Sequence, residues 1–201
     1  MQEKNNKWTL KNVLTLTIFT VIIYILLLIG MIATNILFTP VGAYFACPGI
    51  SALITGPFFI VMVNKIQKRG VTFLLSLISG LLFLVMGQLY TFLVYVIFGI
   101  LTELCFLGKN AYQRPVNLIG AFFFYMLAFS GGGIIPMVLI RKQFIEWYKT
   151  VGNEASVSAM INVYGTLHGV LITVGITLAG CVGGCMIGSS ILRRHVAKAR
   201  I

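Results

Sequence analysis

Three side chains in the second half of the chain offer binding chemistry within an otherwise apolar sequence. His168 lies inside a long apolar stretch, where an ionisable group is a candidate for a functional site. Its imidazole can contact a ligand, and the alternative is a hydrogen-bonded packing histidine. Arg141 and Lys142 follow another apolar stretch. They can bind a carboxylate or a phosphate, or they can be ordinary flanking residues at a membrane surface.

A second set of candidates combines aromatic rings with sulfur, hydroxyl and amide groups. Each residue alone is a weak signal, but together they describe an aromatic, sparsely polar pocket of the kind that binds small molecules. The members of this set are Tyr44, Cys47, Met86, Gln88, Tyr90, Tyr95, Asn162 and Tyr164.

The sequence gives little support for a metal site or for a nucleotide-binding phosphate loop. Cys181 and Cys185 are one helical turn apart, but a metal site there would need two more ligands at the same depth. We therefore expect all four cysteines, which include Cys47 and Cys105, to be packing residues, with no resident metal or cofactor. The sequence has no GxxxxGK[ST] loop, so chemistry driven by ATP would depend on another chain.

These candidates are distributed over six long apolar stretches that fill the 201 residues. Hydrophobic residues make up 59% of the chain and charged residues 9%, which is far from the composition of a soluble domain. A membrane-spanning helix needs about 20 mostly apolar residues. The sequence therefore predicts an all-α membrane protein in which residues 1–201 form a single six-helix transmembrane domain. The predicted spans are 13–33, 43–64, 71–88, 90–107, 117–140 and 160–192.

The distribution of lysine and arginine predicts the orientation of this domain. Twelve of the 15 basic residues lie at the N-terminus, after the second and fourth spans, and in the C-terminal tail. The positive-inside rule then puts both termini in the cytoplasm. The net charge of +11 is mostly orientation charge that can also meet anionic lipid headgroups, and no basic soluble domain carries it to nucleic acid. Glu103, near the cytoplasmic end of the fourth span, is expected to pair with Lys109 or Arg114, or to contact a partner.

Glycine and proline interrupt two of the predicted spans. Pro48 and Pro57 lie in the second span, and residues 43–49 are expected to dip into the bundle as a loop. The fifth span contains Ser130-Gly-Gly-Gly-Ile-Ile-Pro136, where a regular helix is costly. Such interrupted helices often mark binding sites in transporters, and a kink without a ligand is the alternative. We expect the pocket between residues 34–49, Gln88–Tyr95, Gly131–Pro136 and His168.

The sixth span carries small residues at helical spacing, which predicts close packing against a neighbouring helix. These residues are Gly165, Gly169, Thr173, Thr177, Gly180, Gly184 and Gly188.

Several segments, spread over most of the chain, share a pattern with one family of membrane proteins. They are Leu14–Thr20 (LTLTIFT), Phe58–Gly70 (FFIVMVNKIQKRG), Gly99–Leu104 (GILTEL), Gly133–Arg141 (GIIPMVLIR), Phe144–Tyr148 (FIEWY) and Gly180–His195 (GCVGGCMIGSSILRRH). Their order and spacing, together with the chain length, resemble the substrate-binding S components of energy-coupling factor (ECF) transporters, in particular the Trep_Strep or MptD-like type.

The resemblance implies a multi-pass protein of the bacterial cell membrane that is not itself an enzyme. Such a subunit binds a micronutrient from outside, docks on a transmembrane coupling protein with two ATPase subunits that use ATP, and releases its substrate inside. S components often carry an Ala-x-x-x-Ala surface on the first helix for this docking. The matching region here has Thr15, Thr17 and Thr20, which are still small enough for close helix packing.

The candidate residues also favour a class of substrate. An imidazole, sulfur groups, aromatic rings and the Arg141-Lys142 pair suit a flat, apolar, anionic molecule. Haem or another tetrapyrrole is the first expectation, with its propionates at Arg141 and Lys142 and with His168 as a possible axial ligand. Flavin-like, thiamine-like and other vitamin substrates are the alternatives.

An enzymatic interpretation uses Ser130 and His168, which lie at similar calculated depth in the fifth and sixth spans. A serine–histidine pair can activate the hydroxyl as a nucleophile, as in intramembrane serine proteases of the rhomboid type. The rhomboid motif Gly-x-Ser-Gly requires glycine at position 128, where this chain has Ala128. A purely structural or channel-like bundle is the remaining alternative.

Overall fold

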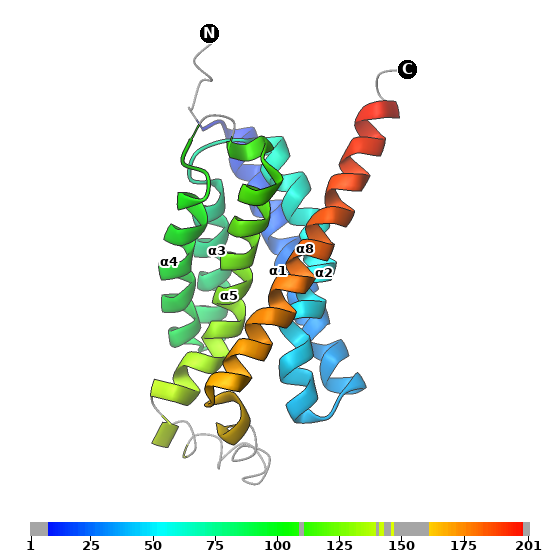
Figure 1. Cartoon of the computed structure of the whole chain (residues 1–201). Coiled ribbons are helices and arrows are strands. Elements are labelled where there is room, and N and C mark those ends of the chain that lie inside the picture. The colour runs from blue at the N-terminus through cyan, green and yellow to red at the C-terminus, as the bar shows by residue number, and fades with distance from the viewer. Residues whose placement is uncertain (1–7, 109–110, 140, 143–145, 147–160, 199–201) are drawn as a thin grey trace.

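The computed structural model describes residues 8–108, 111–139, 141–142, 146 and 161–198, and these residues form helices joined by short turns (Figure 1). Residues 161–164 are helical and are separated from the last helix by a turn at Gly165 and Thr166. The helices are α1 (Leu10–Leu37), α2 (Pro40–Ile66), α3 (Val71–Val85), α4 (Leu89–Leu104), the short 3₁₀ helix η1 (Ala111–Gln113), α5 (Pro115–Leu139) and α8 (Leu167–Lys198).

Four of these helices are long and apolar enough to cross a membrane. They are α1, α2, α5 and α8, with 25 to 28 residues in each candidate span. Helices α3 and α4 are apolar as well, but they have only 15 and 16 residues, fewer than the about 20 that a perpendicular crossing needs. The described part of the chain is thus an all-helical, multi-span bundle, and a sixfold crossing stays a prediction.

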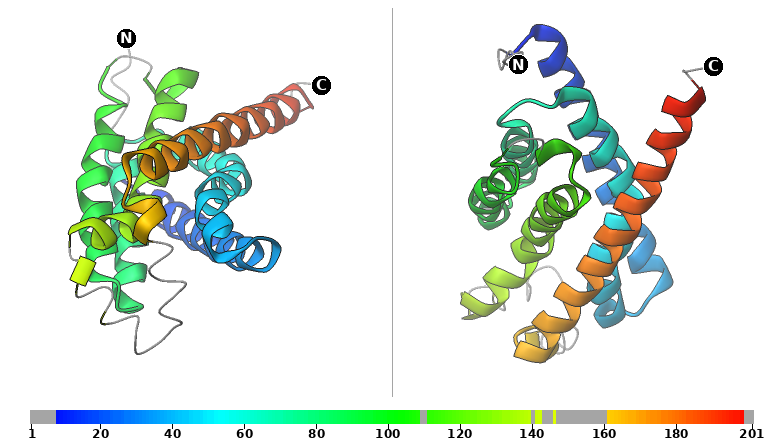
Figure 2. Two further views of the ribbon diagram at one scale, coloured as in Figure 1. Left: turned by 60° about the horizontal axis from the view of Figure 1, so that its bottom comes forward. Right: turned by 45° about the horizontal axis from the view of Figure 1, so that its top comes forward.

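The helices form two groups of three. Helix α2 packs most closely against α8 and α1, and α4 packs most closely against α3 and α5. Figures 1 and 2 show α1, α2 and α8 on one side and α3, α4 and α5 on the other. Fewer contacts join the groups, chiefly those of α1 with α3 and of α5 with α2 and α8. We call this boundary the seam.

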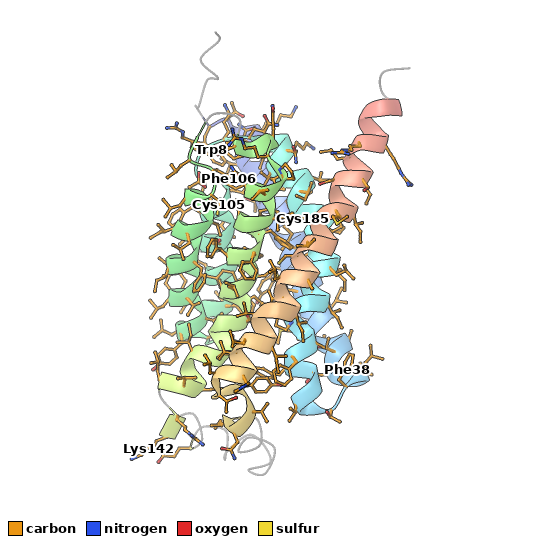
Figure 3. All side chains as sticks on the ribbon, in the orientation of Figure 1. Trp8, Phe38, Cys105, Phe106, Lys142 and Cys185 are labelled. Atoms are coloured by element: carbon orange, nitrogen blue, oxygen red, sulfur yellow. The ribbon has the colours of Figure 1, made fainter. Side chains whose placement is uncertain are left out.

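The two ends of the bundle differ in charge. Helix α1 begins and α8 ends at the same end of the bundle, where α2 also connects to α3 (Figure 1). We call this the basic end, because it holds most of the described lysines and arginines: Lys11, Lys65, Lys68, Arg69, Arg114, Arg193 and Arg194. At the opposite end the described basic residues are Arg141 and Lys142 (Figure 3).

Glycines bring α8 unusually close to α2. A Cβ on Gly56 would lie 2.6 Å from the backbone of Gly184, and a Cβ on Gly188 would lie 2.7 Å from the Cα of Pro57. Gly180 meets the carbonyl oxygen of Gly49 in the same way. The predicted use of the small-residue stripe in close helix packing is confirmed for Gly180, Gly184 and Gly188, since only glycine permits this approach of two backbones, whereas Gly165 lies in the turn before α8.

The predicted breaks in two helices are wrong. Helix α2 continues through Pro48 and Pro57, so residues 43–49 are not a dipping loop, and α5 continues from Pro115 to Leu139 through the glycine run. Proline in a helix leaves the carbonyl four residues earlier without its donor. Inside a packed bundle, neighbouring helices and hydroxyl groups can compensate for this loss. For Pro57 the carbonyl is that of Leu53, and Gly184 of α8 packs against it.

Glu103 fastens the α2–α3 connection at the basic end. Its Oε1 accepts from the backbone N–H of Gly70 at 2.7 Å, and its Oε2 accepts from Thr72 Oγ1 at 2.8 Å. Gly70 is the N-cap of α3 and has no side chain to cap the helix. The carboxylate of Glu103 accepts from the Gly70 backbone N–H, as the acidic residue of a capping box does, and places a negative charge at the positive end of the helix dipole. Trp8 Nε1 donates to the carbonyl of Arg69 at 3.2 Å. Glu103 thus has backbone and hydroxyl partners in place of the expected Arg114, and Lys109 lies outside the described residues.

Candidate functional site

An aromatic cluster, formed by Tyr44, Phe45 and Tyr164, lies at the end of the bundle opposite the basic end. The ring of Tyr164 lies 4.8 Å from the ring of Tyr44 and 4.6 Å from that of Phe45, measured between centroids. The Tyr164 hydroxyl donates to the carbonyl of Val41. Two residues of the predicted pocket, Tyr44 and Tyr164, are therefore in direct contact, although more than 100 residues separate them.

The glycine run of α5 is the point where α5 meets both α4 and α2. A Cβ on Gly132 would lie 2.6 Å from Thr91 Cγ2, and one on Gly133 would lie 3.1 Å from the hydroxyl oxygen of Tyr44. These glycines therefore do not break α5. They let Thr91 of one helix group and Tyr44 of the other approach the same turn of α5.

A second cluster of rings and hydroxyls lies in the interior, where α1 meets α3 and where α4 packs against α3 and α5. Phe83 stacks on Tyr95 with centroids 5.6 Å apart and packs edge-on against Tyr24 at 5.0 Å. Tyr95 and Tyr125 are edge-to-face at 5.5 Å, and the Tyr125 hydroxyl is 2.9 Å from Ser79 Oγ. We call Tyr24, Ser79, Phe83, Tyr95 and Tyr125 the seam cluster, because it joins α1 to the other helix group.

Tyr95 is the least satisfied member of the seam cluster. Its side chain is 0% exposed, and its hydroxyl has no hydrogen-bond partner among the described residues. Its closest polar neighbour is the Tyr125 hydroxyl, which is paired with Ser79 Oγ and can interact with both, because a phenol donates one hydrogen bond and can accept another. Ser76, on the neighbouring helix α3, also has a buried hydroxyl without a partner. A buried polar group without a hydrogen bond costs about 1–3 kcal/mol, so such groups in a native protein require an explanation.

The hairpin between α3 and α4 reaches the seam through the side chain of Met86. Met86 is exposed, and its sulfur accepts a hydrogen bond from the Tyr24 hydroxyl at 2.8 Å. Gln88 is also exposed, and its Oε1 accepts from Thr91 Oγ1 at 3.0 Å. Tyr90 is exposed at 47% and belongs to neither cluster. Of these three predicted site residues, Met86 contacts α1 across the seam, Gln88 bonds within its own helix group and Tyr90 faces outward.

Cys47 lies on α2, one helical turn before Ser51. Its Sγ is 3.9 Å from Ser51 Oγ, within the range of a weak hydrogen bond that involves sulfur. Gly30 of α1 packs directly on Ser51, so this part of α2 is held tightly against α1. Cys47 is half-buried, and its position favours a role in packing between α1 and α2.

The basic and titratable candidates lie at the surface. His168 is exposed in the first turn of α8, and Lys142 is exposed at the end of the molecule (Figure 3). Arg141 is exposed too, and its Nη2 donates to Asn162 Oδ1 at 3.0 Å. This bond joins the segment after α5 to the segment before α8. His168, Arg141 and Lys142 lie at the same end of the bundle as the aromatic cluster and are not part of the seam cluster.

The structure gives no support to the serine–histidine pair of the protease alternative. The Ser130 hydroxyl is turned into its own helix, where it donates to the carbonyls of Met126 and Leu127 at 3.3 Å each. His168 is on the exposed face of α8, whereas Ser130 is buried. The hydroxyl of Ser130 is thus engaged as a packing group within α5.

The three threonines of α1 do not share one face. Each hydroxyl donates to the carbonyl four residues earlier, which satisfies it within the helix. Thr20 is fully buried, Thr15 is half-buried and Thr17 is exposed. Of the three, only Thr17 is freely presented to a partner helix.

An open apolar groove lies between α2 and α8 and borders the aromatic cluster through Phe45. It has a volume of about 570 Å³ and is lined by Phe38 (Figure 3) and by small and aliphatic residues. The lining residues on the helices are Gly42, Phe45, Ala46, Gly49, Ile50, Leu53, Ile176, Ala179 and Gly180. Half of its lining residues belong to the 34–49 segment of the predicted pocket, but none of the individually predicted site residues is among them.

Four members of the seam cluster were not among the residues predicted from the sequence: Tyr24, Ser79, Phe83 and Tyr125. A signal for Tyr24 and Tyr125 did exist, because each is a tyrosine near the centre of a long apolar span, where its hydroxyl needs a partner inside the protein.

Comparison with known proteins places the chain in a family. No curated protein and no solved structure matches it. A family model described as a hypothetical bacterial integral membrane protein (Trep_Strep) matches residues 10–198, which is nearly the whole chain. With its several apolar helices, the chain is a multi-pass bacterial membrane protein and belongs to the Trep_Strep family.

Proposed function

We propose that this protein is the substrate-binding membrane subunit of an ECF-type importer. In this role it captures a small molecule, a micronutrient such as a tetrapyrrole or a vitamin-like compound, at its outer end. A transmembrane coupling protein and two ATPase subunits then drive the release of that molecule into the cell. The proposal also puts the basic end of the bundle in the cytoplasm, in line with the positive-inside rule.

The observation that supports this role is the convergence of aromatic and hydroxyl groups at the seam between the two helix groups. Tyr44 of α2 reaches the glycine run of α5, and Tyr24 of α1 reaches Phe83 and Met86 of the other group. Small-molecule sites are typically apolar and aromatic with a few placed polar groups, and in helical bundles they lie between helices. A site between two separable groups can open and close without either group unfolding.

The importer proposal is tested by uptake in proteoliposomes. The chain is reconstituted alone, with the coupling protein and ATPases, and with ATPases whose catalytic glutamate is replaced. The molecule that co-purifies with the protein serves as the substrate. We expect the chain alone to bind it, and only the complete complex with ATP inside to accumulate it. Accumulation by the chain alone, or the same uptake with inactive ATPases, would contradict the proposal.

A further inference from the structure

The groove between α2 and α8 opens outward and has no polar side chain in its lining. Its lining residues are glycine, alanine, isoleucine, leucine and phenylalanine only. The side chains of Phe38, Leu53 and Ile176 are exposed and form an accessible rim. Because α2 and α8 are both long and apolar enough to span the membrane of this multi-pass protein, the groove faces the hydrocarbon of the bilayer. Its lining is thus continuous with the lipid-facing surface of the bundle.

The groove extends over one leaflet of the bilayer. On α2 its lining runs from Gly42 to Leu53, from the start to the middle of the candidate span Val41–Ile66. On α8 it reaches Gly180, the middle of the candidate span Leu167–Arg194. The helix rises about 16 Å from Gly42 to Leu53, and one leaflet contributes about 15 Å to the hydrocarbon core. The groove therefore reaches from the bilayer surface, where Phe38 lies, to the midplane (Figure 3).

The groove is too narrow for a helix. Its volume of about 570 Å³ over a length of about 16 Å gives a mean cross-section of about 35 Å². A helix with its side chains is about 10–12 Å wide, which corresponds to a cross-section of about 80–110 Å². A helix can therefore only lie across the mouth of the groove, whereas a single hydrocarbon chain can enter it.

The floor of the groove is made of backbone. Gly42, Ala46 and Gly49 put no large side chain on this side of α2, and Gly180 of α8 lies directly against the Gly49 carbonyl. Between apolar surfaces in a membrane, binding depends on van der Waals contact, because lipid is as apolar as the protein. An unfilled groove loses these contacts, and a flexible chain that follows the floor regains them.

We propose that the groove between α2 and α8 binds one acyl chain of a membrane phospholipid, in the leaflet opposite the basic end. The chain is the part that is recognised, because the lining offers a headgroup no charged or hydrogen-bonding side chain. A phospholipid is the source, because its headgroup lies at the bilayer surface, where Gly42 begins the groove, and its chain reaches the midplane, where Leu53 and Gly180 end it. This inference is independent of the importer role.

The test fills the groove from its rim. Ala179→Trp puts an indole into the groove, and Leu178→Trp puts the same side chain at an exposed position outside it. Ala46→Leu fills the groove from α2 and is an independent variant in case the indole lowers the melting temperature. Native mass spectrometry of the full chain, released from detergent micelles, measures the binding of dipalmitoyl phosphatidylcholine. This lipid is zwitterionic, so that the lysines and arginines of the basic end contribute little to its binding.

We expect the wild type to retain one phosphatidylcholine molecule. Ala179→Trp and Ala46→Leu should weaken its binding at least about 5-fold, the lower end of the cost of overpacking expressed as an affinity. Leu178→Trp should bind the lipid as the wild type does. Dihexanoyl phosphatidylcholine has the same headgroup, but its chains are too short to reach the midplane, and it should not displace the long-chain lipid from the wild type.

Three results would overturn the proposal. Lipid binding that is equal in both groove-filling variants and in Leu178→Trp shows that the chain lies elsewhere. Displacement by an equal concentration of the short-chain lipid shows that the headgroup is recognised. A dimer of the wild type that is lost only in the groove-filling variants shows that a second copy of this chain covers the groove. None of these results bears on ATP-dependent accumulation, which tests the importer role separately.

Discussion

The Thr91 hydroxyl donates to the carbonyl oxygen of Gly132 at 3.3 Å, and this is the carbonyl that Pro136 leaves without a helical donor. The same hydroxyl is 3.0 Å from Gln88 Oε1, so its single hydrogen serves two acceptors. Thr91 belongs to α4 and Gly132 to α5. The proline in α5 therefore creates a bonding site for the neighbouring helix, and α5 stays helical.

Loss of the Thr91 hydroxyl should destabilise the α4–α5 pair. Thr91→Val keeps the shape of the side chain but leaves the Gly132 carbonyl buried without a donor, which costs about 1–3 kcal/mol. Thr91→Ser keeps the hydroxyl and is the matched control. Thermal unfolding in detergent micelles should give a lower melting temperature for the valine variant than for the serine variant. Equal melting temperatures for the two variants would show that the proline is compensated in another way.

Two glycines of α8 should respond in opposite ways to the same substitution. Gly180 meets the Gly49 carbonyl of α2, whereas a Cβ on Gly175 would have no neighbour within 4 Å. Gly180→Ala forces the two helices apart, and overpacking of this kind costs about 1–3 kcal/mol. Gly175→Ala should be neutral or gain up to about 1 kcal/mol from the better helix propensity of alanine. A melting temperature for Gly180→Ala equal to that of Gly175→Ala would contradict the close α2–α8 contact.

The helices and one packing surface were predictable from the sequence because long apolar runs and regular glycine spacing are properties of single segments. The predicted spans 13–33 and 117–140 fall within or close to α1 and α5. Continuity through Pro136 was not predictable, because the Gly132 carbonyl that the proline leaves free accepts a hydrogen bond from Thr91, which is distant in sequence. The prediction from proline alone considered the cost within one helix and omitted the neighbours that compensate for it.

The site was predictable only in part, because a position along a span does not give its direction around the helix. Tyr44 and Tyr164 were correctly placed near one end, and they are in contact. His168 was predicted well inside the sixth span, but it lies in the first turn of α8 and is exposed. The small-residue stripe indicates which side of the last helix packs against its neighbour, and so which way His168 points. Successive residues of a helix are about 100° apart, so His168 is rotated away from the buried Gly169 of that stripe.

Glu103 should behave as a helix cap that another helix supplies. Glu103→Ala removes the acceptor for both the Gly70 N–H and the Thr72 hydroxyl. Hydrogen bonds to a charged group contribute about 1.5–3 kcal/mol, and the effect should be at the lower end because the carboxylate is only partly buried. A double-mutant cycle with Thr72→Val measures the coupling. Strictly additive losses would show that Thr72 and Glu103 act independently.

The raised pKa of Tyr112 predicts a loss of stability at high pH. Burial, together with the nearby Glu103 carboxylate, raises the pKa of this phenol from 10 to about 12. The folded state thus disfavours deprotonation. The contribution of the neutral Tyr112 phenol to the free energy of unfolding is fully present below pH 10, where the phenol is neutral in the folded and unfolded states. It is lost as pH rises through 12. Tyr112→Phe keeps the ring that stacks on Phe106 at 4.6 Å and cannot ionise. Wild type should therefore lose more stability than the variant between pH 10 and pH 12, and equal losses would contradict the raised pKa.

The docking surface on α1 should depend on Thr17 and not on Thr20. Thr17 is exposed on the outer face of α1, whereas Thr20 is fully buried against the bundle. Under the proposed importer role, an indole at position 17 blocks close approach of a partner helix and leaves the fold intact. Thr17→Trp should reduce recovery of the coupling protein in a pull-down without changing the melting temperature or ligand binding. Thr20→Trp overpacks the core instead. It should reduce the free energy of unfolding by about 1–3 kcal/mol or more and so lower the melting temperature. Full recovery of the complex with Thr17→Trp would move the docking surface to another helix, and a Thr20→Trp protein as stable as the wild type would contradict the burial of Thr20.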